Sequence, residues 1–265
     1  MKFKILCSDL DGTLLTTKND VSDFTVAEIN RIKNRMKVIL VSARMPQSMT
    51  YLQARLGIEQ NPMVCFNGAL VIHQNTTLVN TMISVANTKI LWNHCQNRGI
   101  RIGLYHGNDW CVSASSERVE KEIFNTKAQP RFEKTEDTLN RWELDGIGPH
   151  KIMLMGTKAA MDDVAPILES RFKEALNCYR SNDTLIEIAP KSVSKLQAIK
   201  SLLKDEESLD DVLAFGDNFN DVEMLQNVGC GVAVANAREA AKKASNFVTS
   251  ANTEDGVAQF IKTHL

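Results

Sequence analysis

The chain contains 265 residues, of which 43% are hydrophobic and 24% charged, and its formal net charge is −1. These values are typical of a globular protein with one large or two smaller domains. Because the basic residues are scattered and the net charge is small, the sequence predicts neither a nucleic-acid-binding face nor a basic membrane-binding patch.

The cysteines and the apolar runs of the sequence indicate the cellular compartment in which the protein is expected. Six dispersed cysteines form no CxxC pair, which disfavours a zinc site or a disulfide scaffold and is typical of a reducing environment. The apolar run at the N-terminus reaches Asp9 too early for a signal peptide, and no run is long enough to span a membrane. We therefore expect a cytoplasmic protein that is a monomer or a weak homodimer.

The first predicted strand, residues 3–7, leads directly to two carboxylates, Asp9 and Asp11, and then to Gly12. Two acids at the end of a strand repel each other and destabilise the fold unless a cation lies beside them. In an open α/β sheet, the carboxyl ends of the strands are also where ligands bind. These residues therefore suggest half of a metal-assisted phosphoryl-transfer site.

The segment up to residue 83 alternates between strands and helices. After a polar loop over 16–20, we expect a helix over 22–36, a strand over 37–41, a helix over 45–56, a strand over 63–66 and a hairpin over 70–80. Ser22 is the expected N-cap of the first helix, and Gly57 closes the second. This alternation predicts a parallel α/β sheet.

From residue 84 to residue 188, hairpins are mixed with helices, which predicts an inserted α+β domain. The expected elements are a helix over 85–98, strands over 100–105 and 110–113, a helix over 116–125, an irregular polar stretch up to residue 149, a strand over 151–155, a helix over 159–176 and a hairpin over 178–188. The insert would separate residues 1–83 from residues 189–265.

The α/β alternation returns after residue 189, so residues 1–83 and 189–265 are predicted to form one domain. The expected elements are a helix over 194–204, a strand over 212–215, a short helix over 222–226, a strand over 230–235, a helix over 237–244, a strand over 247–248 and a terminal helix from residue 254.

Polar residues gather at three strand ends of the predicted parallel sheet, which share one edge. The carboxylates among them are Asp9, Asp11, Asp217 and Asp221. Four carboxylates at one edge require a divalent cation, and oxygen ligands without His or Cys favour Mg²⁺. Lys195, at the start of a helix, would supply the positive charge that the phosphoryl group needs.

The motifs at these positions resemble a known family. Asp-Leu-Asp-Gly-Thr-Leu-Leu at residues 9–15, together with Gly-Asp-Asn-Phe-Asn-Asp at residues 216–221, resembles the haloacid dehalogenase (HAD) superfamily of phosphohydrolases. The position of the insert and the segment 229–237 resemble its Cof-like subfamily IIB. The resemblance covers essentially the whole chain and implies a Rossmann-like parallel-sheet core with an inserted α+β cap domain that determines substrate specificity.

The resemblance also implies catalytic roles. Asp9 would be the nucleophile that forms an aspartyl-phosphate, and Asp11 would act as general acid and then as general base. Ser42, with the neighbouring backbone at Ala43, would bind the phosphoryl oxygens. Lys195 would hold the nucleophile and the phosphate in register.

The metal site follows from the same resemblance. Mg²⁺ would be bound by Asp9, by Asp11 through its backbone carbonyl, and by Asp217, with Asn220 and Asp221 supporting the metal or the phosphate. In this division of roles, positioning and charge neutralisation supply most of the catalysis.

Two departures from the family pattern bear on rate and substrate fit more than on reaction type. Ala43 stands where the family usually has glycine, and Ser192 and Leu196 replace the glycines around the lysine motif. Nearby, Asn67 is expected to order a turn, and Arg44 either to contact substrate or to form a structural ion pair.

The leading hypothesis is a Mg²⁺-dependent phosphomonoesterase that acts on small phosphorylated metabolites, with sugar phosphates as the first class. One alternative is a phosphomutase on the same scaffold, which passes the phosphoryl group to another hydroxyl. Another is a catalytically weak regulatory or binding protein.

Overall fold

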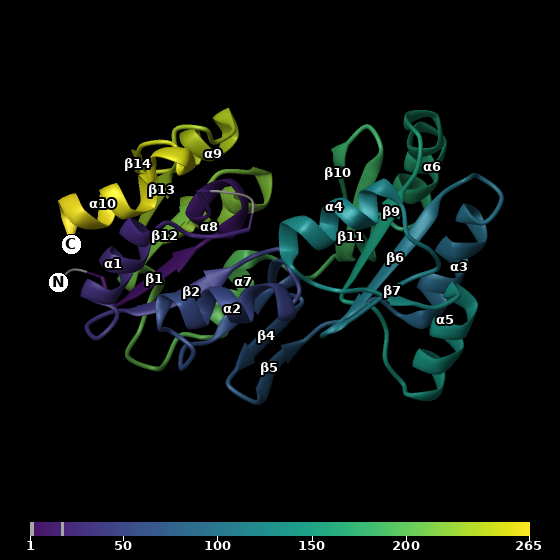
Figure 1. Cartoon of the computed structure of the whole chain (residues 1–265), viewed down its shortest axis with the longest axis horizontal. Helices are drawn as coiled ribbons and strands as arrows, with labels where there is room; N and C mark the ends of the chain where they lie inside the picture. Colours follow the sequence, from purple (N-terminus) through teal and green to yellow (C-terminus); the bar gives the residue numbers. More distant parts are fainter. Residues whose placement is uncertain (1–2, 17–18) are drawn as a thin grey trace. The chain divides into compact units, whose positions relative to one another are not determined.

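The computed structural model describes residues 3–16 and 19–265, so Thr17 and Lys18 of the predicted polar loop lie outside the described residues. The chain divides into two compact units, Met1–Val79 with Ser194–Leu265, and Asn80–Val193 (Figure 1). The expected limits of the insert were residues 84 and 188. The observed unit is wider because both of its ends are hydrogen-bonded within it: Ile83 N donates to Pro149 O, and Lys191 N donates to Ala175 O.

The first unit contains an eight-stranded sheet. Its strands are β1 (Ile5–Ser8), β2 (Lys37–Val41), β3 (Met63–Cys65), β4 (Leu70–His73), β5 (Thr76–Asn80), β12 (Val212–Gly216), β13 (Cys230–Ala233) and β14 (Phe247–Val248). They lie in the order β14-β13-β12-β1-β2-β3-β4-β5. All pairs from β14 to β3 are parallel, and β4 is antiparallel to β3. β1 therefore lies inside the sheet, between β12 and β2.

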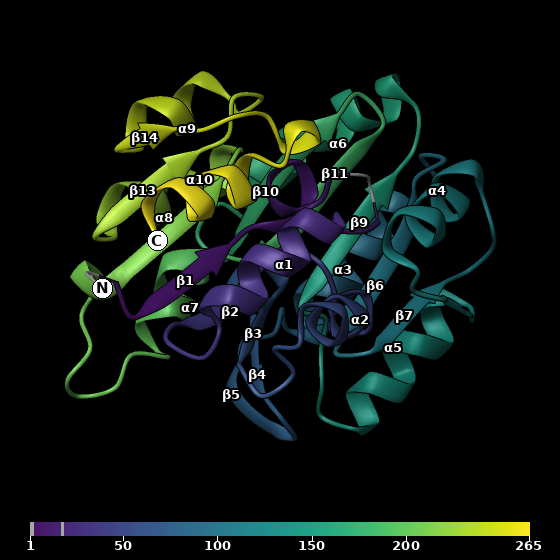
Figure 2. The ribbon, with the colours of Figure 1, turned by 60° about the vertical axis from the view of Figure 1, so that its left-hand side comes forward.

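Helices cover both faces of this sheet (Figure 2). They are α1 (Asp23–Ile32), α2 (Gln47–Leu56), α7 (Lys195–Lys200), α8 (Val222–Asn227), α9 (Glu239–Ala244) and α10 (Gly256–His264). The core beneath α7 and α8 contains Ile199, Met224 and alternate residues of β1 and β12. On the opposite face, Phe260 of α10 packs edge-on against Phe215 of β12. Cover on both faces explains why every residue of β1 and β12 is buried and why all of them except Ser8 are apolar or glycine.

The predicted N-cap of α1 and the predicted C-terminal glycine of α2 are both present. The Ser22 hydroxyl accepts the Thr25 backbone N–H and caps α1, and Gly57 closes α2 with a φ of +64°. Such caps satisfy backbone groups that a helix end leaves unpaired.

The second unit contains a six-stranded sheet and four helices. Its elements are α3 (Val85–Cys95), β6 (Arg101–His106), β7 (Asp109–Val112), α4 (Glu117–Thr126), β8 (Arg131–Phe132), α5 (Thr135–Leu144), β9 (Lys151–Met155), α6 (Lys158–Arg171), β10 (Leu176–Asn182) and β11 (Leu185–Pro190). The strand order is β10-β11-β9-β6-β7-β8. The pairs are antiparallel except β7 with β8. Leu91, Trp142 and Val164 bring α3, α5 and α6 into one core with this sheet.

The expectation of an irregular stretch up to residue 149 was wrong, because β8 and α5 lie there. The buried face of α5 consists of Thr135, Thr138, Leu139 and Trp142. Their spacing is helical, but two of the four are threonines, so the apolar stripe is half missing from the sequence.

The predicted fold class, a parallel α/β core with an α+β insertion, is confirmed. Within residues 3–16 and 19–265, no helix combines the length and the apolar character that crossing a bilayer requires.

Candidate active site

Three neighbouring strands bring the predicted site residues to one edge of the sheet. Asp9 follows β1, Ser42 follows β2 and Asp217 follows β12. Backbone hydrogen bonds continue past the strand ends, because Asp9 N donates to Phe215 O at 3.0 Å and Ser42 N donates to Val64 O at 2.9 Å. The three side chains are therefore carried by a rigid sheet edge, where ligands bind in open α/β folds.

Three carboxylates and one ammonium group form the centre of the site. Asp9, Asp217 and Asp221 each offer an oxygen within 4.8 Å of the others. Lys195 Nζ donates to Asp9 Oδ1 at 2.5 Å and to Asp221 Oδ1 at 2.6 Å. Asp9, Asp221 and Lys195 are all at least 95% buried. A buried lysine is tolerated only when it is paired, and here it is paired twice.

The cluster is short of positive charge. Burial raises the pKa of Asp9 well above its usual value; Lys195 opposes this, while Asp221 and Asp217 add to it. Burial, followed by the charge of Asp221, also raises the pKa of Asp217 to about 6. Burial alone would lower the pKa of Lys195, but attraction to Asp221 and Asp9 outweighs it and raises the pKa. Three acids and one lysine leave two negative charges unbalanced.

The residues present fit a divalent cation. The donor set consists of carboxylate oxygens only, which is the chemistry that Mg²⁺ prefers. Asp221 is the least available of the three, because its Oδ2 accepts the backbone N–H groups of Asp217 and Asn218 at 3.0 Å and its Oδ1 accepts Lys195. Asp9 and Asp217 therefore offer the better ligand atoms, with Asp221 holding the lysine and the loop.

Gly12 and Thr13 bring the backbone of residues 9–15 into close contact with Asp217. Gly12 has a φ of +84°, and a Cβ atom there would lie 2.7 Å from Asp217 Oδ2. Both the left-handed backbone and the close approach require glycine. The Thr13 hydroxyl donates to Asp217 Oδ1 at 3.0 Å. Thr13 belongs to the first motif, but the sequence alone gave no reason to assign it this contact.

Asp11 lies apart from the acid cluster. Both of its oxygens accept hydrogen bonds from Arg44, whose Nε and one terminal nitrogen lie 2.7 Å away. The Arg44 side chain is 3% exposed, whereas that of Asp11 is 54% exposed. Of the two roles considered for Arg44, the structural ion pair is the one present, and its partner is the predicted acid/base.

The predicted phosphate-binding residues lie on two loops. The Ser42 hydroxyl accepts the backbone N–H of Arg44 at 3.2 Å, so it and Ala43 form a tight turn after β2. Asn220 Nδ2 donates to Asn67 Oδ1 at 2.9 Å. Asn67 orders a turn, as expected, and its amide also reaches across to the loop that contains Asp217.

Asn236 is a further residue that sequence reasoning did not assign to the site. Its Nδ2 donates to Gly12 O at 2.8 Å, and its Oδ1 accepts the Asn252 backbone N–H at 2.8 Å. It thus supports the turn after Asp9 from the far end of the chain. Its position in the family-like segment 229–237 was the available signal.

The three positions that depart from the family's glycines do not require glycine here. The described non-glycine residues with positive φ are Phe66, Asn67, Gln74, Lys127 and Asp255. Ala43, Ser192 and Leu196 are therefore outside the left-handed region, and Leu196 is buried in the core. The replacements are conformationally compatible with the observed loops.

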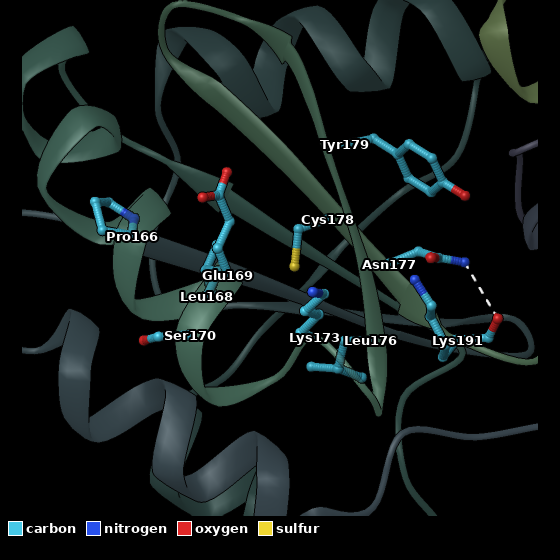
Figure 3. A pocket seen from close by; sticks show the side chains of 10 residues that line it. All are labelled: Pro166, Leu168, Glu169, Ser170, Lys173, Leu176, Asn177, Cys178, Tyr179 and Lys191. Carbon is cyan, nitrogen blue, oxygen red and sulfur yellow. Dashed lines mark hydrogen bonds between the residues drawn. The ribbon is translucent and has the colours of Figure 1, made fainter.

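A hollow of about 610 Å³ lies in the second unit, beside the end of α6 and the start of β10 (Figure 3). Lys173, Lys191 and Glu169 contribute its charged lining. None of the predicted site residues lines it.

Comparisons with known proteins match almost the whole chain. A family model for haloacid dehalogenase-like hydrolases matches residues 6–261. A protein of Haemophilus influenzae is 31% identical over 99% of this chain and 98% of its own length. The pyridoxal phosphate phosphatase YbhA of Escherichia coli is 28% identical over the full length of both chains. The crystal structure of a haloacid dehalogenase-like hydrolase from Bacteroides thetaiotaomicron superposes with a TM-score of 0.90 at 26% identity, covering all of both chains.

Proposed function

The chain belongs to the haloacid dehalogenase-like hydrolases, and from this premise we propose that it is a Mg²⁺-dependent phosphatase of small phosphorylated metabolites. Its motifs resemble those of the Cof-like subfamily IIB. The observation that carries the proposal is the buried Lys195, which bridges Asp9 and Asp221 beside Asp217. Burying a charge cluster of this kind costs folding free energy, and groups with strongly shifted pKa values gather at functional sites.

Asp9 is the proposed nucleophile. Its oxygen attacks the phosphorus, the bond from phosphorus to the substrate oxygen breaks, and an aspartyl-phosphate forms on Asp9. Water then attacks the phosphorus, the bond to Asp9 breaks, and orthophosphate leaves with Asp9 restored. Lys195, held by Asp221, keeps the Asp9 carboxylate in place and balances part of the phosphoryl charge. The Ser42 turn would bind the phosphoryl oxygens.

Asp11 is the proposed acid and base. It would protonate the leaving alkoxide and then take a proton from the attacking water. Both oxygens of Asp11 accept hydrogen bonds from Arg44. To carry and donate a proton, Asp11 must release at least one of these two bonds.

Asp9 and Asp217 would hold Mg²⁺, together with the Asp11 backbone carbonyl that the family resemblance implies. When bound, the ion neutralises negative charge on the phosphoryl oxygens and on the carboxylates. Thr13 and Asp221 orient the Asp217 segment through the hydrogen bonds described above.

For the substrate, we propose a small phosphomonoester, with sugar phosphates as the first class. The relative named as a pyridoxal phosphate phosphatase supports a phosphorylated metabolite of this size and adds pyridoxal phosphate as a second class to test. The inserted unit is the proposed source of selectivity.

The test is a screen of sugar phosphates, pyridoxal phosphate and a generic aryl phosphate with Mg²⁺, using Asp9→Asn as the negative control. Turnover by the wild type that is lost in Asp9→Asn and in the presence of EDTA supports the proposal. A wild type without turnover on any of them would favour the regulatory alternative. Transfer of phosphate to a second hydroxyl, with no orthophosphate released, would identify a phosphomutase.

A further inference from the structure

The turn Phe66–Gly68 has an uncommon backbone. Its three residues have φ values of +51°, +56° and +104°, so all lie in the left-handed region. Asparagine and glycine tolerate this region, but a bulky residue such as phenylalanine adopts it only where the surrounding structure holds it there. The Phe66 side chain is fully buried. Such backbone strain gathers at functional sites.

Contacts with two other loops hold the turn in place. Phe66 N donates to Arg44 O at 3.1 Å, and Asn67 N donates to Ser42 O at 2.9 Å. A Cβ atom on Gly68 would lie 2.5 Å from Ser194 O. The turn is therefore packed between the Ser42 loop and the residue that precedes Lys195.

The Asn67 side chain adds a third connection. Its Oδ1 accepts Asn220 Nδ2 at 2.9 Å, across 153 residues of sequence. Through its backbone N–H and its amide oxygen, Asn67 thus links Ser42 to Asn220. Glycine would meet the backbone requirement of the turn equally well, so the need for an asparagine lies in the amide.

We propose that Asn67 is a positioning residue, which fixes Asn220 relative to Ser42 so that both can bind one phosphoryl group. The proposal rests on the proposed function, because that function assigns Ser42 and Asn220 to the phosphoryl group. The left-handed turn serves to present the Asn67 amide at the correct place between the two loops.

The test is a double-mutant cycle of Asn67→Gly, Asn220→Ala and the double variant, assayed with Mg²⁺ and the aryl phosphate. Asn67→Gly keeps the backbone conformation accessible and removes only the amide. We expect each single variant to lower kcat/KM about tenfold, with the double variant no worse than Asn220→Ala, because the Asn67 amide acts only through Asn220. The inhibition constant of orthophosphate should rise by a similar factor.

Gln74→Gly is the matched control. Gln74 also has a positive φ, +55°, but it lies in the exposed β4–β5 hairpin, where its amide bonds Gln60. Its kcat/KM should stay within about twofold of the wild type, and the unfolding midpoint should rise or stay level in both glycine variants.

Two results would overturn the inference. One is a hundredfold, additive loss in the double variant. The other is an Asn67→Gly variant with wild-type kcat/KM and wild-type phosphate inhibition. Loss of turnover in Asp9→Asn tests the proposed function without involving Asn67, so that function can survive when the inference fails. A wild type with neither turnover nor phosphate binding would contradict both.

Discussion

The two partners of the Arg44–Asp11 pair differ sharply in exposure, with Arg44 buried and Asp11 half exposed. Removing one partner therefore has unequal consequences. Without Arg44, the Asp11 carboxylate can be solvated. Without the Asp11 charge, the buried guanidinium loses its two hydrogen bonds of 2.7 Å, and its contacts to Ser48 O and to the Tyr51 hydroxyl are longer, at 3.4 Å. Removing the ionic partner of a buried charge is the more costly case.

We predict that Asp11→Asn lowers the free energy of unfolding by about 1–3 kcal/mol, besides lowering activity. The matched control is Asp163→Asn, whose partner Arg98 lies 2.8 Å away in an exposed pair. This control should change stability by less than about 0.5 kcal/mol. Urea unfolding followed by circular dichroism measures both. Equal losses of unfolding free energy in the two variants would mean that the burial of Arg44 does not raise the cost of removing its partner.

Sequence reasoning located Asp9, Asp217 and Lys195 because motifs at strand and helix ends fix where such side chains go. It did not foresee that Asp11 bonds Arg44, or that Asn67 bonds Asn220. These contacts depend on side-chain rotamers and on loops that meet only in the folded chain. Spacing along the sequence carries no information about either.

Among the elements, the loop after β2 departs from the family pattern at Ala43. Since its φ is not in the left-handed region, the methyl group imposes no backbone strain. We predict that Ala43→Gly lowers the free energy of unfolding by about 0.4–1 kcal/mol through the greater freedom of the unfolded chain. It should leave kcat/KM within about threefold. A rise of tenfold or more would show that the methyl group narrows the phosphate-binding turn.

The loop before β9 is joined to Asn80 by His150. The His150 side chain donates from Nε2 to Asn80 Oδ1 at 2.7 Å, and its Nδ1 accepts the Gly107 N–H at 3.1 Å. Burial first, and then the charge of the nearby His106, lowers the pKa of His150 to about 3. Both hydrogen bonds fit the neutral ring.

This lowered pKa makes stability depend on pH. The unfolded chain takes up the proton near pH 6.5, well before the folded chain does. The stabilisation is therefore complete above about pH 6.5 and is lost progressively as the pH falls towards 3. Between pH 7 and pH 5, His150 should account for a loss of about 2 kcal/mol.

The measurement is urea unfolding at pH 7 and pH 5 for the wild type and for His150→Gln. The variant should have the flatter pH dependence, because glutamine does not titrate. An equal change in the free energy of unfolding between pH 7 and pH 5 in the wild type and the variant would contradict a neutral buried His150.

At the scale of elements, most helices and strands were predicted because their apolar spacing or end signals were clear. The helix α5 was missed, since Thr135 and Thr138 occupy half of its buried face. In this helix the burial pattern is set by tertiary packing, and composition alone does not reveal it.

At the scale of the whole molecule, each unit has its own hydrophobic core, and the acid cluster lies entirely in the first. We predict that calorimetry resolves two unfolding transitions and that Mg²⁺ raises only one of them. Mg²⁺ at 100 times its dissociation constant stabilises the protein by about 2.7 kcal/mol. For a unit of this size, that is a rise in midpoint of roughly 5–10 °C.

EDTA should reverse the rise, and Asp217→Asn should abolish it. A shift in both transitions, or one that persists in Asp217→Asn, would contradict a metal site confined to this cluster.

The two-part architecture could be predicted because the alternation of strands and helices stops and later resumes. The limits of the insert were misplaced by a few residues, since Ile83 and Lys191 are tied into the second unit by backbone hydrogen bonds with no sequence signature. The pairing of β1 with β12 on one side and β2 on the other was not predicted, because the alternation of strands and helices indicates a parallel sheet but not the order of its strands.

The pairing of β1 with β12 also determines when the site can form during translation. Asp9 and Lys195 are separated by 186 residues, which a ribosome takes roughly 10–40 s to add. The second unit is one continuous segment, so it can fold on the nascent chain within that interval. The first unit must leave one side of β1 open until β12 emerges. Asp9 and Lys195 can thus meet only late in translation, so the proposed nucleophile is synthesised long before it can act.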